Sequence, residues 1–350
     1  METNRLSSVF LGFLTVIAVS VVLRYTAGLM VPFVTAVLFT FVLSPVVEYL
    51  HRTAKLPRFV SIFLVILLVM GVIFLIGLFF YTSVLALYRE VPKYNAKSAL
   101  ILEHALIRFR LPADMMNHIP WARTISNSLF AFTRQFMDFL SSLVLMMLFL
   151  VFLLMERPLL RPKLKEAFRA ETTKKISRIY THVAQQISRF LSGKLLISAI
   201  TGTLTWIICW IIGVEFAFVW GVLTFFFNFI PSVGSIIITV ITGLFAILQF
   251  YPSWNEPVIV IIAITVVQQV MGNFIEPRLL GDWLNLSPVV IIFSLLVWGW
   301  IWGIVGMFIS VPMTVAVKIF CENVPFLKPA AVLMGRGRPR PPQGRSPENP

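Results

Sequence analysis

The chain has 350 residues, of which 58% are hydrophobic and only 13% are charged, and its formal net charge is +14. A soluble domain carries about 25% charged residues and has no means of hiding this much apolar surface, so the composition predicts an all-α polytopic membrane protein. The basic residues collect in connecting loops, and the positive-inside bias explains them without nucleic acid as a partner. Two distant cysteines and four scattered histidines indicate no disulfide framework, metal centre or cofactor.

Residues 1–88 are predicted to form three spans, Leu6–Leu23, Ala27–Val47 and Phe59–Tyr88. A signal peptide is the alternative for the first, but the residues ahead of it carry no net positive charge and apolar segments follow, which favours an uncleaved span. The third exceeds the ~20 residues that cross the hydrocarbon, so it must tilt or project. The loop His51–Arg58 is basic without an acid, which places it and the N-terminus in the cytoplasm.

The middle of the chain alternates between polar and apolar segments. Residues 89–135, with mixed charge and three prolines, are predicted to form an extracytoplasmic helical segment, although Lys and Arg exceed the acids there. Residues 136–155 form a fourth span. Residues 156–194 contain ten Lys or Arg and three acids, which indicates a cytoplasmic loop. Within it, Lys174–Phe190 has the spacing of an amphipathic helix that either packs beside the membrane surface or binds a partner.

The C-terminal part, residues 195–322, is predicted to be the transport core, followed by a disordered basic cytoplasmic tail, residues 323–350. The core contains two spans, Leu195–Ile212 and Val258–Asn273, and two interrupted segments, Phe216–Phe250 and Val289–Phe320. Halves of about 15 residues fall short of a ~20-residue span, so re-entrant hairpins and full crossings both remain open. The second segment is expected to break near Trp298–Gly306, where Gly299 and Gly303 form a GxxxG pattern typical of close helix packing.

Two further sequence features mark a candidate binding site, the breaks Asn228–Ser235 (NFIPSVGS) and Gly272–Pro288 (GNFIEPRLLGDWLNLSP). Only five charged side chains lie between Lys194 and Lys318, and three of them fall in the second break. Charge is costly in lipid, so these groups should face protein, water or a cavity. Two interrupted hydrophobic segments indicate a transporter's binding site. The candidate substrate-binding residues are Asn228, Pro231, Ser232, Gly234, Ser235, Asn273, Glu276, Arg278, Gly281 and Asp282.

Each charged or amide candidate has a structural alternative. Glu276 and Arg278 would then pair with each other or meet the lipid interface, Asp282 would cap a turn, and Asn228 and Asn273 would satisfy broken backbone. The prolines and Gly281 predict that the helix is interrupted from Gly272 onwards. If the two breaks form one site, Pro231–Ser235 and Glu276–Asp282 should approach each other near the membrane middle.

The sequence contains no motif of an energy-coupling or catalytic enzyme. Ser192-Gly193-Lys194 lacks the upstream glycine and the following Ser or Thr of a phosphate-binding loop, which argues against an ATP-driven pump. Neither GxSxG nor HExxH occurs, which argues against an intramembrane hydrolase. The sequence is therefore interpreted as a non-enzymatic protein without a cofactor.

Two long stretches resemble the autoinducer-2 exporter family of transporters. They are FAFVWGVLTFFFNFIPSVGSIIITVI, residues 216–241, and the stretch from Gly272 to Ile319, which begins GNFIEPRLLGDWLNLSP. The resemblance extends in outline over residues 1–330. It implies a bacterial inner-membrane transporter with about eight spans. Some members of that family export the quorum-sensing signal autoinducer-2, and others are linked to sodium/proton exchange.

Three functions compete. Secondary, non-ATP export of a small uncharged polar solute such as autoinducer-2 is favoured, because the breaks are mostly neutral. Cation/proton antiport is the alternative and needs a titratable carboxylate, for which Glu276 and Asp282 are the candidates. A non-transporting membrane scaffold is the third. The expected partners are the lipid bilayer and a small polar solute, with protons or sodium under antiport and a second copy of the chain in a homo-oligomer. Both termini are expected in the cytoplasm of a multi-pass inner-membrane protein.

Overall fold

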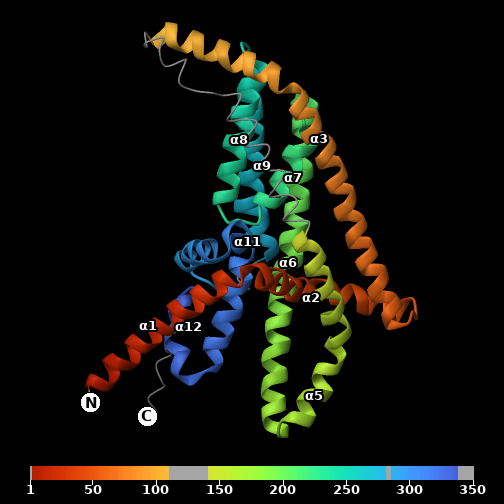
Figure 1. Ribbon diagram of the computed structural model, residues 1–350, viewed down its shortest axis with the longest axis vertical. Coiled ribbons are helices and arrows are strands. Elements are labelled where there is room, and N and C mark those ends of the chain that lie inside the picture. The colour runs from red at the N-terminus through yellow and green to blue at the C-terminus, as the bar shows by residue number, and fades with distance from the viewer. Residues whose placement is uncertain (1, 110–140, 281–284, 338–350) are drawn as a thin grey trace, which may run out of the picture.

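The computed structural model describes residues 2–109, 141–280 and 285–337, and every regular element within them is a helix (Figure 1). This confirms the all-α class. Seven helices in this part of the chain are long and apolar enough to cross a membrane. They are Ala27–Thr53, Arg58–Ile101, Ser141–Leu159, Ala170–Ile212, Val233–Phe250, Asn255–Leu279 and Pro288–Asn323. The expected first span is also helical, as α1 (Glu2–Tyr25), but is outside these seven.

The N-terminal helices α2 (Ala27–Thr53) and α3 (Arg58–Phe109) pack against the span Ser141–Leu159. α3 is one helix of 52 residues, about 78 Å long at 1.5 Å per residue. The change from span to polar segment at residues 88 and 89 is therefore a change of composition within one helix. Figure 1 shows α3 bending towards its C-terminal end, and the helix contains Pro92, which removes a backbone donor.

The central element is α6 (Ala170–Ile212), which follows the short α5 (Leu160–Ala167). The predicted amphipathic helix and the predicted fifth span are parts of this single helix. On the amphipathic stripe, Ile187 and Phe190 are buried in a core cluster that also contains Phe41 of α2. Figure 1 shows α5 at the lower end of α6, with α2 crossing it and further helices beside its upper part.

The first interrupted segment is confirmed as two helices, α7 (Ala217–Phe227) and α8 (Val233–Phe250). Their packing includes Trp220 and Phe245, whose ring centroids are 5.1 Å apart. At 11 residues, α7 spans only about 16 Å, roughly half of the ~30 Å hydrocarbon thickness. α7 is therefore too short to cross the bilayer by itself.

The predicted interruption at Gly272 is wrong. α9 (Asn255–Gln269) continues through a π-helix, Val270–Ile275, into α10 (Glu276–Leu280). The Glu276 N–H donates to the carbonyl of Met271, five residues back. This wider π turn shifts the hydrogen-bond pattern from four to five residues immediately before Pro277. The helix therefore continues although Pro277 has no backbone N–H to donate. The helix is described as far as Leu280, and Gly281 and Asp282 lie outside the described residues.

The second interrupted segment, α11 (Pro288–Asn323), is broken at Trp302 and Gly303, as predicted. Gly303 has φ +63° and forms the turn itself, whereas Gly299 has the close packing that the GxxxG pattern predicts. The two arms fold tightly against each other. A Cβ at Gly306 would lie 2.0 Å from the Trp298 carbonyl oxygen, and a Cβ at Gly299 would lie 2.9 Å from Met307 Cε.

The tail is ordered further than predicted. A 3₁₀ turn, Pro325–Leu327, leads into α12 (Lys328–Met334), where Ala331 is buried. The Met334 carbonyl accepts a hydrogen bond of 2.9 Å from the N–H of Ser287, immediately before α11. The apolar segment before the basic, proline-rich end thus packs against α11 and is ordered, and residues 338–350 lie outside the described residues.

Candidate functional site

The first break is a tight turn between α7 and α8, closed by backbone hydrogen bonds. Ser232 has φ +59°, and the Gly234 N–H donates to the carbonyl of Ile230 at 3.1 Å. A Cβ at Gly234 would lie 1.7 Å from the Phe227 carbonyl oxygen, so only glycine fits. This turn directs the side chain of Asn228 inward, where it is buried and donates from Nδ2 to Ser198 Oγ of α6 at 3.0 Å.

The second break contributes a buried ion pair. Glu276 Oε1 lies 2.6 Å from Lys194 Nζ of α6. The Lys194 side chain is 3% exposed and that of Glu276 is 24% exposed. A lysine in this position needs its counter-ion, because an isolated charge in an apolar interior costs several kcal/mol. The predicted pairing of Glu276 with Arg278 is therefore wrong: Arg278 is exposed and forms no ion pair among the described residues.

Both breaks meet α6 on the same face. Lys194 and Ser198 are four residues apart, so their Cβ atoms lie about 5–6 Å from each other on neighbouring turns. Glu276 and Asn228 thus contact adjacent positions of one helix. The first break also reaches the returning arm of α11, where the rings of Phe229 and Phe308 are 6.0 Å apart. A polar group from each break is consequently held at one level of the helical bundle.

The other candidates lie away from this contact. Ser232 is exposed, and Pro231 and Ser235 are half-buried. Asn273 is exposed and donates to the amide oxygen of Gln269 on its own helix. The described structure therefore brings Asn228 and Glu276 to a common place and leaves Asn273 outside it, as it does Arg278.

Sequence reasoning missed Lys194 and Ser198, which form the α6 side of the site. The sequence places Lys194 at the end of a basic loop, where the positive-inside bias already explains a lysine. A signal was nevertheless present: Lys194, Ser198, Thr201 and Thr205 are spaced by four, three and four residues, which places them on one face of a helix. All four are buried.

A second buried lysine supports the other end of the break. Lys318 of α11 donates from Nζ to the carbonyl of Asn285 at 2.8 Å, and its Nζ lies 3.5 Å from Glu322. Asn285 has φ +42°, a backbone conformation that this bond helps to hold. The backbone at Asn285, shortly before α11 begins, is thus held by a side chain of α11.

At the far end of the bundle, a polar cluster ties α3 to the loop between α6 and α7. Glu215 Oε1 lies 2.6 Å from Lys93 Nζ, and Glu215 also accepts a hydrogen bond from Tyr94. The amide of Gln249 bridges the Glu215 N–H and the Gly213 carbonyl, each at 2.8 Å. Partial burial raises the pKa of the Glu215 carboxyl, but the hydrogen bonds from Lys93 and Tyr94 outweigh it, and the pKa is below its ordinary value.

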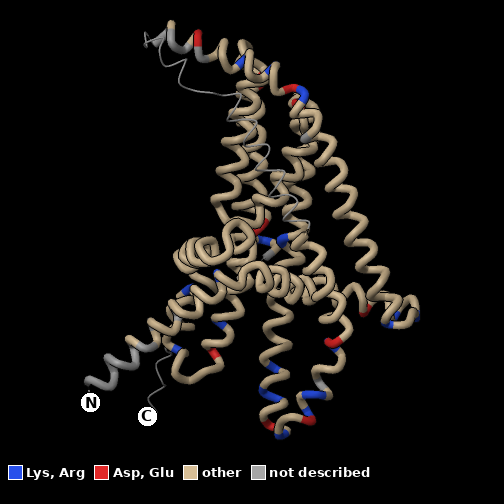
Figure 2. Tube along the Cα trace, viewed as in Figure 1, with Lys and Arg blue, Asp and Glu red and all other residues tan. Residues whose placement is uncertain are grey.

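Charge is distributed unevenly around these sites. Figure 2 shows that Lys, Arg, Asp and Glu gather at the α5–α6 turn and at the C-terminal end of α3, and are sparse along α7, α8 and α9. Close to the Lys194–Glu276 pair along the chain, Arg278 is exposed and lies outside the pair. Because its two charges cancel, the contact between the breaks is polar but carries no net charge.

Comparison with known proteins identifies the family. Residues 10–326 match the model of the AI-2E family transporters. A putative transport protein of Borreliella burgdorferi is 34% identical over 95% of this chain and 91% of its own length. The AI-2 transport protein TqsA of Escherichia coli is 30% identical over 93% of this chain and 94% of its own, and the putative transport protein YhhT of the same species is 30% identical over 90% of each. The chain therefore belongs to the AI-2E family of membrane transporters.

Proposed function

We propose that this chain exports a small, uncharged polar solute without ATP hydrolysis, and that autoinducer-2 is the candidate substrate. The observation that carries the proposal is that the turn between α7 and α8 and the π turn before α10 both contact one face of α6, through Asn228 and Glu276. A relative named as an AI-2 transport protein supports the choice of substrate. Interrupted helices at a shared level are the usual location of a transporter's substrate site.

The charge of the contact favours a neutral solute. Lys194 and Glu276 already neutralise each other, so a charged solute would add an uncompensated charge to a poorly solvated place. An uncharged polar solute needs only hydrogen bonds, which the Asn228 amide, the Ser198 hydroxyl and the backbone of the break supply. The solute exchanges bonds with water for bonds with these groups, at little electrostatic cost.

Cation/proton antiport is the second candidate, favoured by one specific observation. Glu276 is a carboxylate directly after the π turn of a membrane helix, and about a quarter of its side chain is accessible. A cation or proton would bind it only by displacing Lys194. Antiport would therefore consist of repeated breaking and reforming of this ion pair.

The deciding experiment is flux into liposomes that contain the purified chain. Autoinducer-2 and sodium are compared with and without an imposed pH gradient. We expect autoinducer-2 to cross and sodium flux to remain at the level of protein-free vesicles. Sodium flux that follows the pH gradient, without autoinducer-2 transport, would replace the proposal by antiport, and absence of both fluxes would favour a scaffold.

We further propose that the protein lies in the bacterial inner membrane with both termini in the cytoplasm, since 51–58 and 156–194 are its basic connections. Reporter fusions at residues 55, 175 and 340 should all report the cytoplasm. A periplasmic signal at residue 175 would overturn this orientation, because it lies in the most basic connection.

A further inference from the structure

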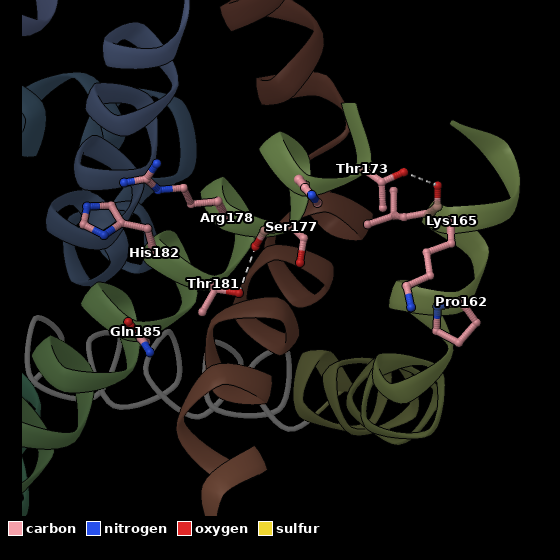
Figure 3. A pocket seen from close by; sticks show the side chains of 10 residues that line it. Pro162, Lys165, Thr173, Ser177, Arg178, Thr181, His182 and Gln185 are labelled. Atoms are coloured by element: carbon pink, nitrogen blue, oxygen red, sulfur yellow. Dashed lines mark hydrogen bonds between the residues drawn. The ribbon is translucent and has the colours of Figure 1, made fainter. Parts of the chain in front are cut away.

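A basic hollow lies between α5 and the first turns of α6, away from the contact between the breaks (Figure 3). Its volume is about 730 Å³. Pro162, Leu164 and Lys165 line it from α5, and seven residues between Thr173 and Gln185 line it from α6. No carboxylate is among the residues that line it. The hollow is large enough for a phosphate group together with the neighbouring part of a larger molecule.

The two walls are fixed to each other by Thr173. Its side chain is almost fully buried, and Oγ1 donates to the carbonyls of Leu164 at 2.9 Å and Phe168 at 3.2 Å. These bonds close the end of the α5–α6 turn. On the α6 wall, Thr181 Oγ1 is held by the Ser177 carbonyl at 2.8 Å. The shape of the hollow is therefore built into the local hydrogen bonding.

Its positive charge is concentrated and uncompensated. Lys174, Arg178 and His182 follow one another at intervals of four residues, so they lie on one face of α6, and Figure 3 shows Arg178 and His182 directed to the same side. Like charges at this spacing repel each other. Among the described residues, Lys165, Lys174 and Arg178 form no ion pair, whereas the neighbouring Lys163 pairs with Glu156. An anion in the hollow would relieve this repulsion.

The position of the hollow favours a lipid as the source of that anion. α5 begins directly after the candidate span Ser141–Leu159. Leu159 and Phe168 flank α5 with exposed fractions of 48% each, as expected for side chains that reach the membrane interface. Basic pockets beside the ends of membrane helices bind anionic headgroups, and a guanidinium with lysines and a hydroxyl suits phosphate oxygens.

We propose that this hollow binds the phosphate headgroup of an anionic phospholipid, with Arg178, Lys174 and Lys165 as the charged contacts and Ser177 as a hydroxyl donor. The site belongs to the cytoplasmic connection, so it would couple the lipid surface to α6. α6 is the helix that carries Lys194 and Ser198.

The test measures thermal unfolding of the purified full chain in neutral detergent. Phosphatidylglycerol, phosphatidylcholine and inorganic phosphate are added separately. The test variant is Lys165→Gln/Lys174→Gln/Arg178→Gln. The control Arg157→Gln/Arg169→Gln/Lys175→Gln removes the same charge from the same connection, at residues outside the hollow. All six side chains are at least partly accessible, so both variants should fold.

We expect phosphatidylglycerol to raise the unfolding temperature of the wild type and the control by about 2–4 °C, a shift typical of a modest gain in stability. Phosphatidylcholine and millimolar inorganic phosphate should have no effect, and the test variant should not respond to any of the three. An equal response of the two variants would show general charge attraction and overturn the proposal. Stabilisation by inorganic phosphate alone would reassign the hollow to a soluble anion, and no response of the wild type would remove the site.

Discussion

The ion pair between Lys194 and Glu276 makes an asymmetric prediction about stability. In Glu276→Gln, the ammonium of Lys194 remains with only 3% of its side chain exposed and no counter-ion. In Lys194→Met, the remaining carboxylate is 24% exposed and keeps access to water. Loss of one partner of a buried pair costs about 3–5 kcal/mol when the other charge is stranded. Glu276→Gln should therefore be the more damaging change.

The magnitudes follow from these exposures. We expect Glu276→Gln to lower the free energy of unfolding by about 3–5 kcal/mol. Lys194→Met should lower it by roughly 1–3 kcal/mol, the cost of an unsatisfied but partly hydrated group. The double variant removes both charges and should lie within about 1 kcal/mol of the wild type, because replacing a buried pair by uncharged groups is often neutral.

Equilibrium unfolding in mixed micelles, with increasing mole fraction of a denaturing detergent, measures these differences. Arg278→Gln serves as the control for removing a charge near the same break, since Arg278 is exposed. Two results would refute the reasoning. One is a larger loss for Lys194→Met than for Glu276→Gln, and the other is a double variant whose loss equals the sum of the single losses.

Three further predictions concern single positions. Gly234→Ala should lower the free energy of unfolding by at least roughly 1–3 kcal/mol, because its methyl would overlap the Phe227 carbonyl. In the same unfolding assay Gly272→Ala should have little effect, because no atom lies within 4 Å of the added carbon. Arg278→Ala should fold like the wild type and keep its liposome flux within twofold. Loss of folding or of flux would show that this exposed arginine is needed. The pKa of Glu215 is lowered from 4.5 in the folded state, so its ion pair contributes stability above that pH and loses it as the pH falls below about 4.5. The free energy of unfolding of Glu215→Gln should accordingly be lower than that of the wild type at pH 7, by roughly 1 kcal/mol or less for so accessible a pair. In acid the two free energies should become equal.

The helical class and the positions of two breaks could be predicted because local chemistry determines them. Asn228–Ser235 combines an amide, a proline and a glycine within an otherwise apolar run, and no regular helix satisfies that backbone. Trp298–Gly306 contains three glycines, of which Gly303 takes the left-handed conformation at the turn. In both cases the breaking signal lies within a few residues of the break itself.

The predictions were wrong where a π turn, packing against a distant helix or a distant ion-pair partner determined the structure instead of the neighbouring residues. Pro277 normally ends a helix, but the π turn before it changes the hydrogen-bond register and removes the conflict. Residues 328–334 precede a basic, proline-rich end and are predicted to share its disorder, yet they are mostly apolar and form a helix that packs against α11. Glu276 has an arginine two residues away, but neighbours at that spacing do not face each other on a helix. Its partner is 82 residues distant, and no local window contains it.

The correct partner of Glu276 also changes the balance between the two transport mechanisms. If Glu276 faced only Arg278 at the surface, a cation would compete with a flexible, hydrated guanidinium for the carboxylate, at little cost. With Lys194 as the partner, each binding event would leave a buried ammonium without its counter-ion, at about 3–5 kcal/mol, unless that ammonium lost a proton or moved to water. Antiport thus requires a large change around Lys194 in every cycle. A neutral solute requires none, since the pair stays intact while the solute exchanges hydrogen bonds with Asn228 and its neighbouring turn.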